Sequence, residues 1–246
     1  MKATLDLTEV ASVGGFFALR TGEPPGGAQV APLARVYAGD DGPLAFRADK
    51  VADRLGAPDL RIGVSVAQLG LAARLWSVAL GSAALHGVVP DLDPALLHWD
   101  ADGSTPDDLW LTEVTTRPGD AASIRDVVQL GHLAPLADAL RTRYRISAPL
   151  LWGNAGSALA GAARELDTWA RRTGRTEVGQ RARALAAELF DHPDLRGTGT
   201  LSGTAFRRRS CCLYYRCPNG GVCGDCCFDR PPQRSVRGSS PPGASG

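Results

Sequence analysis

The chain has 246 residues, of which 44% are hydrophobic and 22% charged, and its formal net charge is +1. This composition excludes a disordered, fibrous or strongly polyionic protein, and the length allows a core that needs no disulfide. The charge is uneven, because residues 201–246 carry +5 and the rest of the chain therefore sums to −4. All six cysteines lie between Cys211 and Cys227. We therefore expect function to reside in this basic, cysteine-rich end.

Residues 1–60 are rich in glycine and proline. Their short apolar runs, residues 13–19 and 31–37, predict short strands or irregular structure, and residues 49–55 predict one or two helical turns. At the amino terminus, Asp6 and Glu9 stand where a secretory signal needs an apolar core. We expect a cytoplasmic protein, with a place near the inner face of the membrane as an option.

Arg74 is the only formally charged residue between Arg61 and Asp91. This run is long enough to span a membrane, but it contains Gln68, His86 and several glycines, and a charge near its centre is costly in lipid. Its apolar residues lie all round rather than along one stripe, which is typical of a helix surrounded by other helices. The sequence therefore predicts a buried central helix and no stable membrane insertion.

The chain after residue 91 alternates between short strand-like runs and helical patterns. Residues 96–99 and 109–114 flank a turn-forming stretch and predict a small hairpin. Apolar residues at spacings of three and four then mark three helices, over residues 133–144, 151–169 and 182–189. We expect these helices to pack against the long apolar one.

The expected fold class is α+β, with a helix-dominated body, a few short strands and a C-terminal cysteine-rich segment. We assign the body to residues 1–200 and the cysteine segment to residues 201–230. Residues 197–203 are rich in glycine and predict a flexible link between them. Residues 231–246 consist largely of proline, glycine and serine, so we expect a disordered tail.

The cysteines include two pairs that suit a metal. Cys223-Gly-Asp-Cys226 has the spacing at which a tight turn brings two thiolates to one metal. Cys211 and Cys212 are adjacent, so they either make two distorted bonds to one ion or divide between the irons of a cluster. Residues 218–221 favour a turn that folds one pair back onto the other. Cytosolic thiols stay reduced and no βαβ pattern surrounds the CxxC, which favours metal ligation over disulfides or thioredoxin-like exchange.

The whole pattern, Cys-Cys-x10-Cys-x2-Cys, resembles the carboxy-terminal signature of the FhuF-like ferric-siderophore reductases, which bind a [2Fe–2S] cluster. The sequences Arg-Arg-Ser-Cys-Cys-Leu-Tyr-Tyr-Arg and Cys-Gly-Asp-Cys resemble the same segment. Upstream, LWGN at residues 151–154 and AQLGLAARLW at residues 67–76 resemble actinobacterial members of the family.

The resemblance implies a cofactor and a ligand set. The cofactor would be a [2Fe–2S] cluster, with no catalytic residue beyond it. Four cysteines would hold this cluster: Cys211, Cys212, Cys223 and Cys226. The sequence departs from the family pattern by adding Cys217 and Cys227. These offer alternative ligands, Cys227 in place of Cys226 or Cys217 in place of one of the first pair, but by the resemblance the two additional thiols are not ligands.

The function that the resemblance implies is that of an oxidoreductase, which donates one electron to siderophore-bound Fe(III) and releases Fe(II) for iron acquisition. The implied partners are a ferric siderophore and an external electron donor, a ferredoxin or an NAD(P)H-dependent reductase, because no flavin or nicotinamide fingerprint is visible. Four arginines near the cysteines are candidates to bind an anionic ferric complex: Arg207, Arg208, Arg209 and Arg216. The alternative for these arginines is a solvated basic flank.

The alternative function is a non-enzymatic binding module, in which a zinc site made of four cysteines stabilises the basic C-terminal end for contact with nucleic acid or a protein. The basic end has no basic helix, and the body carries no recognised nucleic-acid motif. We therefore expect no nucleic-acid partner.

Overall fold

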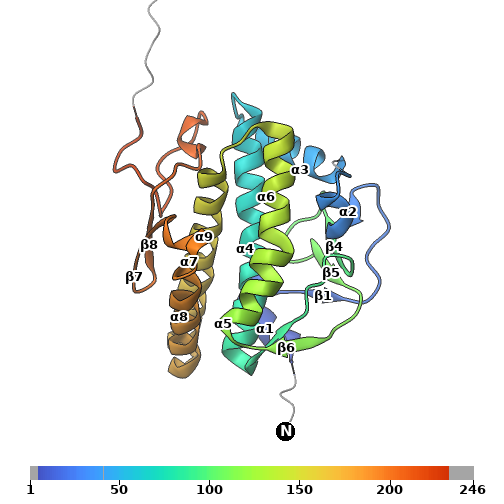
Figure 1. Cartoon of the computed structure of the whole chain (residues 1–246), viewed down its shortest axis with the longest axis vertical. Coiled ribbons are helices and arrows are strands. Elements are labelled where there is room, and N and C mark those ends of the chain that lie inside the picture. Colours follow the sequence, from blue (N-terminus) through green and yellow to red (C-terminus); the bar gives the residue numbers. More distant parts are fainter. Residues whose placement is uncertain (1–4, 41, 233–246) are drawn as a thin grey trace, which may run out of the picture.

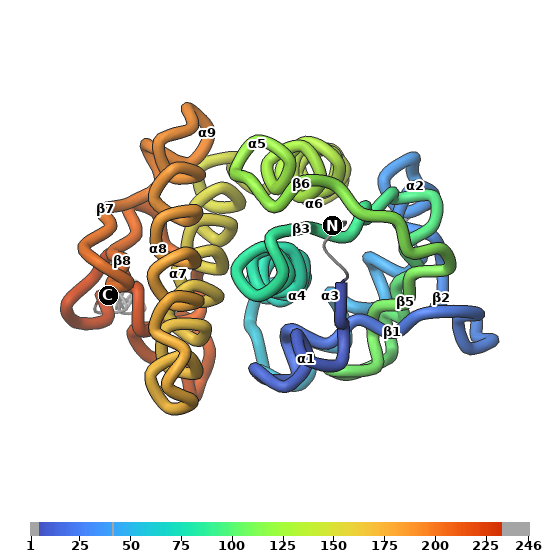
Figure 2. Tube along the Cα trace, turned by 90° about the horizontal axis from the view of Figure 1, so that it is seen from below, coloured from blue at the N-terminus to red at the C-terminus, as the bar shows by residue number. Residues whose placement is uncertain are grey.

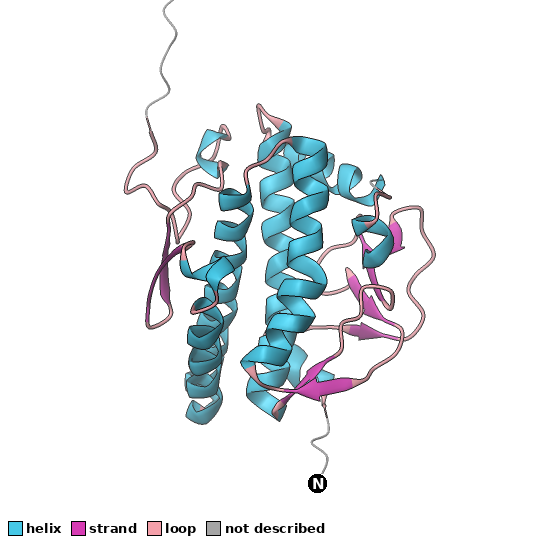
Figure 3. Ribbon diagram, viewed as in Figure 1, coloured by secondary structure: helices cyan, strands magenta, loops and turns pink. Residues whose placement is uncertain are grey.

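A layer of long helices forms the centre of the molecule, with short strands on its two sides (Figure 1, Figure 3). The computed structural model describes residues 5–40 and 42–232. Its α-helices are α1 Leu7–Ala11, α2 Leu33–Tyr37, α3 Gly42–Leu55, α4 Leu60–His86, α5 Ala121–Ile124, α6 Ala134–Tyr144, α7 Ala148–Thr173, α8 Thr176–Phe190 and α9 Pro193–Arg196. Shorter 3₁₀ and π segments are η1 Gly15–Phe17, η2 Arg125–Leu133 and η3 Tyr214–Arg216. The expected helix-dominated α+β fold class is confirmed.

Helix α4 lies near the centre of the molecule and packs against α3, α7 and α8 (Figure 2). It begins where the Asp59 carboxylate accepts a hydrogen bond from the Arg61 N–H at 2.9 Å, and it ends at Gly87 in the left-handed region, φ 70°. The helix is long and apolar enough to cross a membrane, but 72% of its most apolar window is buried inside the protein. The prediction of a buried central helix is confirmed.

The strands are short: β1 Arg20–Thr21, β2 Val30–Pro32, β3 Val88–Pro90, β4 Leu97–Asp100, β5 Leu109–Leu111, β6 Thr116–Pro118, β7 Gly199–Ser202 and β8 Ala205–Arg208. They form a four-stranded sheet in the order β1-β5-β4-β2 and two separate pairs, β3-β6 and β7-β8. The predicted hairpin is present, since β4 and β5 are antiparallel with Leu97 opposite Leu111 and Trp99 opposite Leu109. These four side chains are buried and anchor the sheet on the helical core.

The observed helices are longer than predicted: α7 and α8 extend at both ends, and two others differ in ways that the structure explains. α3 has 14 residues where one or two turns were expected, because it packs closely on α4 at Gly63, where a Cβ would lie 2.4 Å from the Ala48 carbonyl oxygen. The helix expected from residue 133 begins at α5, capped by the Asp120 carboxylate, and runs through η2 into α6. Pro135 therefore lies inside a continuous helix, just after the π turns of η2.

The stretch predicted as a flexible link is largely a strand. β7 pairs with β8 in an antiparallel hairpin, in which Leu201 lies opposite Phe206, and the buried Phe206 ring packs on Phe190 of α8 with ring centroids 5.1 Å apart. The prediction of a flexible link was wrong because it considered local glycine content without this tertiary contact. The predicted disordered tail lies, from residue 233 onward, outside the described residues.

A buried ion pair joins the centre of α4 to the segments around it. Arg74 is 1% exposed and Asp108 3% exposed, and Nε of Arg74 donates to a carboxylate oxygen of Asp108 at 2.8 Å. The remaining guanidinium nitrogens donate to the carbonyl oxygens of Gly15 (2.9 Å), Phe16 and Pro106 (3.2 Å). Burial lowers the pKa of Arg74, and Asp108 opposes that effect. Arg74, the one charged residue within the long apolar run, therefore has a structural role: it joins α4 to the segments that pack around it.

Candidate metal centre

Residues 209–230, the part of the cysteine segment that holds the thiols, lie against α7 on the side of the helical layer opposite the four-stranded sheet (Figure 2). It follows β8 directly, so the hairpin sets where it starts. The Arg208 N–H donates to the Asp225 carbonyl at 3.0 Å, which joins the end of β8 to the turn between Cys223 and Cys226. The Gly220 N–H donates to the Cys217 carbonyl at 3.0 Å and closes the turn predicted at residues 218–221.

The four predicted ligands are brought together in a connected group of thiols. Sγ of Cys212 lies 3.8 Å from Sγ of Cys223. This is about the sulfur–sulfur separation expected for two ligands of one tetrahedral metal with metal–sulfur bonds of about 2.3 Å. Cys211 is adjacent to Cys212 in the chain, and the Cys226 N–H donates to the Cys223 carbonyl at 3.0 Å, which closes the turn between that pair. None of the six cysteines forms a disulfide.

The ionisation of these thiols is uneven. Hydrogen bonds with Cys211 and Cys223 lower the pKa of Cys212 far below its ordinary value, and the same hydrogen bonds raise the pKa of Cys211 and Cys223. By contrast, burial raises the pKa of Cys217 and of Cys227. The group thus favours a thiolate at Cys212, the form in which a cysteine binds metal.

Backbone N–H groups point at two of the predicted ligands. Sγ of Cys211 accepts from the Leu213 N–H at 3.2 Å, and Sγ of Cys226 accepts from the Phe228 N–H at 3.4 Å. Leu213 adopts a left-handed conformation with φ 70°, which is unusual for a residue with a Cβ. The turn therefore holds its N–H toward a sulfur, an arrangement that stabilises negative charge on metal-bound thiolates.

The segment is fixed to α7 and α4 by buried polar contacts. Nη2 of Arg208 donates to Oδ1 of Asn154 at 2.6 Å, and both residues are buried. The Asn154 side-chain amide donates to Oγ of Ser65 at 3.1 Å and to Oε1 of Gln68 at 2.9 Å. Ser65 in turn donates to the carbonyl oxygen of Cys212 at 2.9 Å. The contacts that Arg208 and Cys212 make with the body therefore belong to one hydrogen-bond network.

A second anchor lies between the paired cysteines Cys223 and Cys226. Asp225 is 8% exposed, and its carboxylate accepts from the Ser157 hydroxyl at 2.5 Å and from Arg164 at 3.5 Å. Both partners belong to α7. The aspartate of the Cys-Gly-Asp-Cys turn thus attaches the turn to the helix.

The four predicted arginines occupy different environments. Arg208 is 3% exposed, whereas Arg207 and Arg209 are exposed. Arg207 forms an ion pair with Asp229 at 2.8 Å, and the Arg216 guanidinium lies over the Tyr215 ring, 5.7 Å from its centroid. Arg209 lines a cavity of about 280 Å³ together with Trp152. Only the exposed arginines are placed to meet a ligand from solvent.

The donor set fits an anionic metal cluster. Among residues 5–40 and 42–232, no group of three or more His, Cys, Asp or Glu side chains is arranged to hold a single metal ion. A two-iron cluster does not need four sulfurs around one point. In addition, Nε and Nη1 of the buried Arg208 have no hydrogen-bond partner among the described residues, which leaves two charged N–H donors without an acceptor next to the cysteine segment. A cluster with thiolate ligands would supply the missing negative charge.

Comparison with known families agrees with this geometry. Residues 208–228 match the FhuF 2Fe-2S C-terminal domain. The cysteine-bearing segment is FhuF-like. Its cofactor is a [2Fe–2S] cluster, and the protein is an iron–sulfur redox protein. No curated protein matches the chain significantly, so the FhuF-like assignment rests on this short segment.

The network behind the FhuF-like segment was not predicted as part of the site. Ser65, Gln68 and Asn154 read as interior positions of helices, and nothing in their local sequence indicates a partner at residues 208–212. Both LWGN and AQLGLAARLW, which resemble family sequences, contribute to it through Asn154 and Gln68. The resemblance of these two stretches to family sequences was the signal that could have assigned Asn154 and Gln68 to the site.

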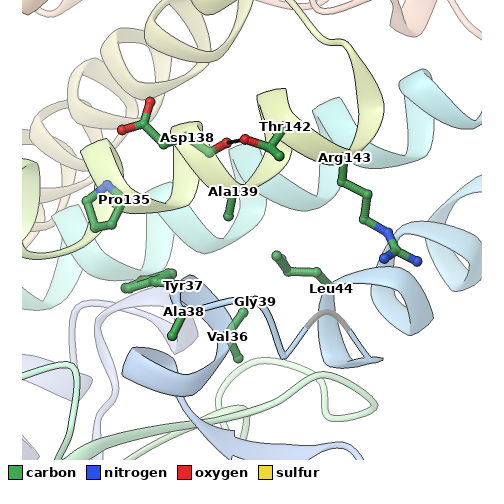
Figure 4. Close-up of a pocket in the computed structure, with 10 residues that line it drawn as sticks. All are labelled: Val36, Tyr37, Ala38, Gly39, Leu44, Pro135, Asp138, Ala139, Thr142 and Arg143. Carbon is green, nitrogen blue, oxygen red and sulfur yellow. Dashed lines mark hydrogen bonds between the residues drawn. The ribbon is translucent and has the colours of Figure 1, made fainter.

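One further cavity, of about 460 Å³, is lined by residues of α2 and α6 (Figure 4). Helix α7 separates it from the FhuF-like segment (Figure 2). The Tyr37 hydroxyl at its wall lies 2.8 Å from Nδ1 of His132, whose Nε2 lies 2.6 Å from the Leu92 carbonyl. Since Nε2 must donate to that carbonyl, the tyrosine donates to Nδ1 and is occupied. We assign this cavity no part in the redox site.

The turn at residues 217–220 offers a test of the segment's geometry. A Cβ at Gly220 would lie 2.1 Å from the Tyr214 carbonyl oxygen, whereas a Cβ at Gly221 would meet nothing within 4 Å. We expect Gly220→Ala to open the turn at a cost of about 1–3 kcal/mol, typical of overpacking, and to accelerate loss of the cluster. The measurement is the rate at which visible absorption bleaches in the presence of an iron chelator.

Gly221→Ala is the matched control and is expected to bleach at the wild-type rate. Equal rates for the two alanine variants would show that the turn at Gly220 does not hold the cluster.

Proposed function

We propose that this protein is a ferric-siderophore reductase. The match of residues 208–228 to the FhuF 2Fe-2S domain is the observation that supports this function. When bound, the cluster supplies one electron at a time. The hard oxygens of a siderophore bind Fe³⁺ far better than Fe²⁺, so the reaction Fe³⁺ + e⁻ → Fe²⁺ releases the metal without breaking any covalent bond of the siderophore.

The ligands in this proposal are Cys211, Cys212, Cys223 and Cys226. The 3.8 Å distance between Cys212 and Cys223 supports this set, as do the N–H donors at Cys211 and Cys226. Cys217 is 4% exposed and accepts no such backbone hydrogen bond within the described residues. We therefore assign it to packing.

Docking of the ferric complex is assigned to the exposed arginines. Arg209 and Trp152 border the 280 Å³ cavity beside Ser210, which immediately precedes the first ligand. Arg207 and Arg216 add positive charge around the segment, which favours encounter with an anionic complex. Arg208 is excluded from this role because its guanidinium is buried against Asn154.

The electron is proposed to come from a separate protein, a ferredoxin or an NAD(P)H-dependent reductase. The cavities found in the described part of the chain carry no dinucleotide-binding glycine motif. The siderophore and the donor must therefore both approach the segment from outside.

The proposed reaction is tested by mixing dithionite-reduced protein, freed of excess dithionite, with a ferric siderophore. We expect the reduced protein to reoxidise in step with the appearance of Fe²⁺ trapped by a ferrous chelator. The control is the gallium complex of the same siderophore, which has the same shape and charge but accepts no electron. Reoxidation no faster with iron than with gallium would reject the function.

The docking assignment is tested in the same assay at low ionic strength. Reversal of charge at Arg207 and Arg209 is expected to slow the reaction with an anionic ferric complex, and added salt is expected to remove the difference. An unchanged rate at low salt would reject the docking role and indicate that these arginines are only solvated surface charges.

A further inference from the structure

Arg208 is the only arginine of the Arg207–Arg209 run whose side chain is buried, at 3% exposure. Its Nη2 is held by Oδ1 of Asn154 at 2.6 Å and more weakly by the Leu150 carbonyl at 3.4 Å. Nε and Nη1 have no hydrogen-bond partner, and no carboxylate forms an ion pair with this guanidinium among the described residues. A buried cation with two unsatisfied donors is destabilising unless an anion offsets it.

The position of Arg208 points to the anion. Its own backbone N–H binds the Asp225 carbonyl at 3.0 Å, between Cys223 and Cys226. Its partner Asn154 shares Ser65 with the Cys212 carbonyl. Hydrogen bonds therefore link Arg208 to the segments that carry both cysteine pairs.

We propose that Arg208 is the buried counter-charge of the [2Fe–2S] cluster and that Asn154 is the positioning residue that aims it. In this arrangement Nε–H and Nη1–H donate toward the cysteine sulfurs or the cluster. The proposal rests on the ligand set given under the proposed function, but not on siderophore reduction.

A positive charge at Arg208 is expected to raise the reduction potential of the cluster. Reduction adds one negative charge to the cluster, so a nearby cation stabilises the reduced form more than the oxidised form and raises the reduction potential. The interaction is strong at Arg208 because burial excludes water and salt from it. It is weak at Arg207, which is exposed and already paired with Asp229.

The test is a redox titration of the cluster-loaded protein, monitored by visible absorption and by the electron paramagnetic resonance signal of the reduced state. Arg208→Gln keeps a polar side chain of similar reach and removes the charge, and we expect a lower midpoint potential and faster bleaching by a chelator. Arg208→Lys keeps the charge and is expected to restore most of the potential. Arg207→Gln, the same charge loss one residue away, is expected to titrate like the wild type.

Asn154→Asp is the second variant, chosen because it leaves Arg208 in place. The new carboxylate pairs with the guanidinium and cancels its charge, so the potential is expected to fall although residue 154 does not touch the cluster. A wild-type potential in Arg208→Gln would overturn the proposal. Loss of the cluster from Arg208→Lys, with Arg207→Gln still loaded, would also overturn it, because the lysine variant keeps the charge.

These measurements use no siderophore. Failure of the counter-charge proposal therefore appears as an unchanged potential, whereas failure of the reductase proposal appears only in the comparison of the iron and gallium complexes.

Discussion

Replacing Cys212 with alanine is expected to abolish the [2Fe–2S] cluster and the visible colour of the protein. Cys212 is 5% exposed, lies 3.8 Å from Cys223, and has the thiol whose pKa is lowered most, by its hydrogen bonds with Cys211 and Cys223. Removing a residue that only hydrogen-bonds to a metal ligand typically weakens metal binding by about 10–100-fold. Removing the ligand itself is expected to weaken cluster binding by more than this. The measurement is iron and sulfide content after anaerobic purification, together with the visible spectrum.

Alanine is preferred to serine because a serine oxygen can replace a thiolate as an iron ligand. Cys217→Ala and Cys227→Ala are the controls and are expected to keep the full cluster content. Cys217 is buried, so its loss is expected to cost about 1 kcal/mol of stability through a small cavity. A coloured Cys226→Ala variant beside a colourless Cys227→Ala variant would mean that Cys227 is the fourth ligand.

Arg74→Met is expected to cause the largest loss of stability from one substitution in the body. The variant leaves the carboxylate of Asp108 buried without a cation, and it leaves the carbonyl oxygens of Gly15, Phe16 and Pro106 without their donor. Breaking a buried pair by removing one partner costs about 3–5 kcal/mol. The measurement is the free energy of unfolding from urea denaturation, monitored by circular dichroism.

The control for Arg74 is Arg20→Met. Arg20 pairs with Asp107, next to Asp108, but their side chains are 47% and 61% exposed, so the expected loss is at most about 1 kcal/mol. The double variant Arg74→Met/Asp108→Leu removes both buried charges and is expected to recover part of the stability lost in Arg74→Met. A loss in Arg74→Met no larger than in Arg20→Met would contradict the structural role of the buried pair.

Much of the body was predictable because its long helices carry their own signals. The run around Arg74 is apolar on all sides but carries a central charge, which favours a helix surrounded by other helices, and α7 and α8 show apolar residues at spacings of three and four. The hairpin of β4 and β5 was predictable from two apolar runs around a turn. α3 and β7 were not, because each is set by a distant contact: α3 by Gly63 of α4, and β7 by its pairing with β8.

The sequence by itself determined the chemistry of the site. Cysteine spacing along 17 residues is a local property, and it indicated a metal cofactor, while the resemblance to the FhuF-like signature implied the four candidate ligands. The same sequence contains Arg207, Arg208 and Arg209 as three equivalent residues, and only the tertiary structure distinguished them. In β8 alternate side chains face opposite sides, so Arg208 turns toward Asn154 of α7 while its neighbours face solvent. The interaction between two charges is stronger where less water surrounds them, so burial makes Arg208 the arginine that acts on the cluster in our proposal.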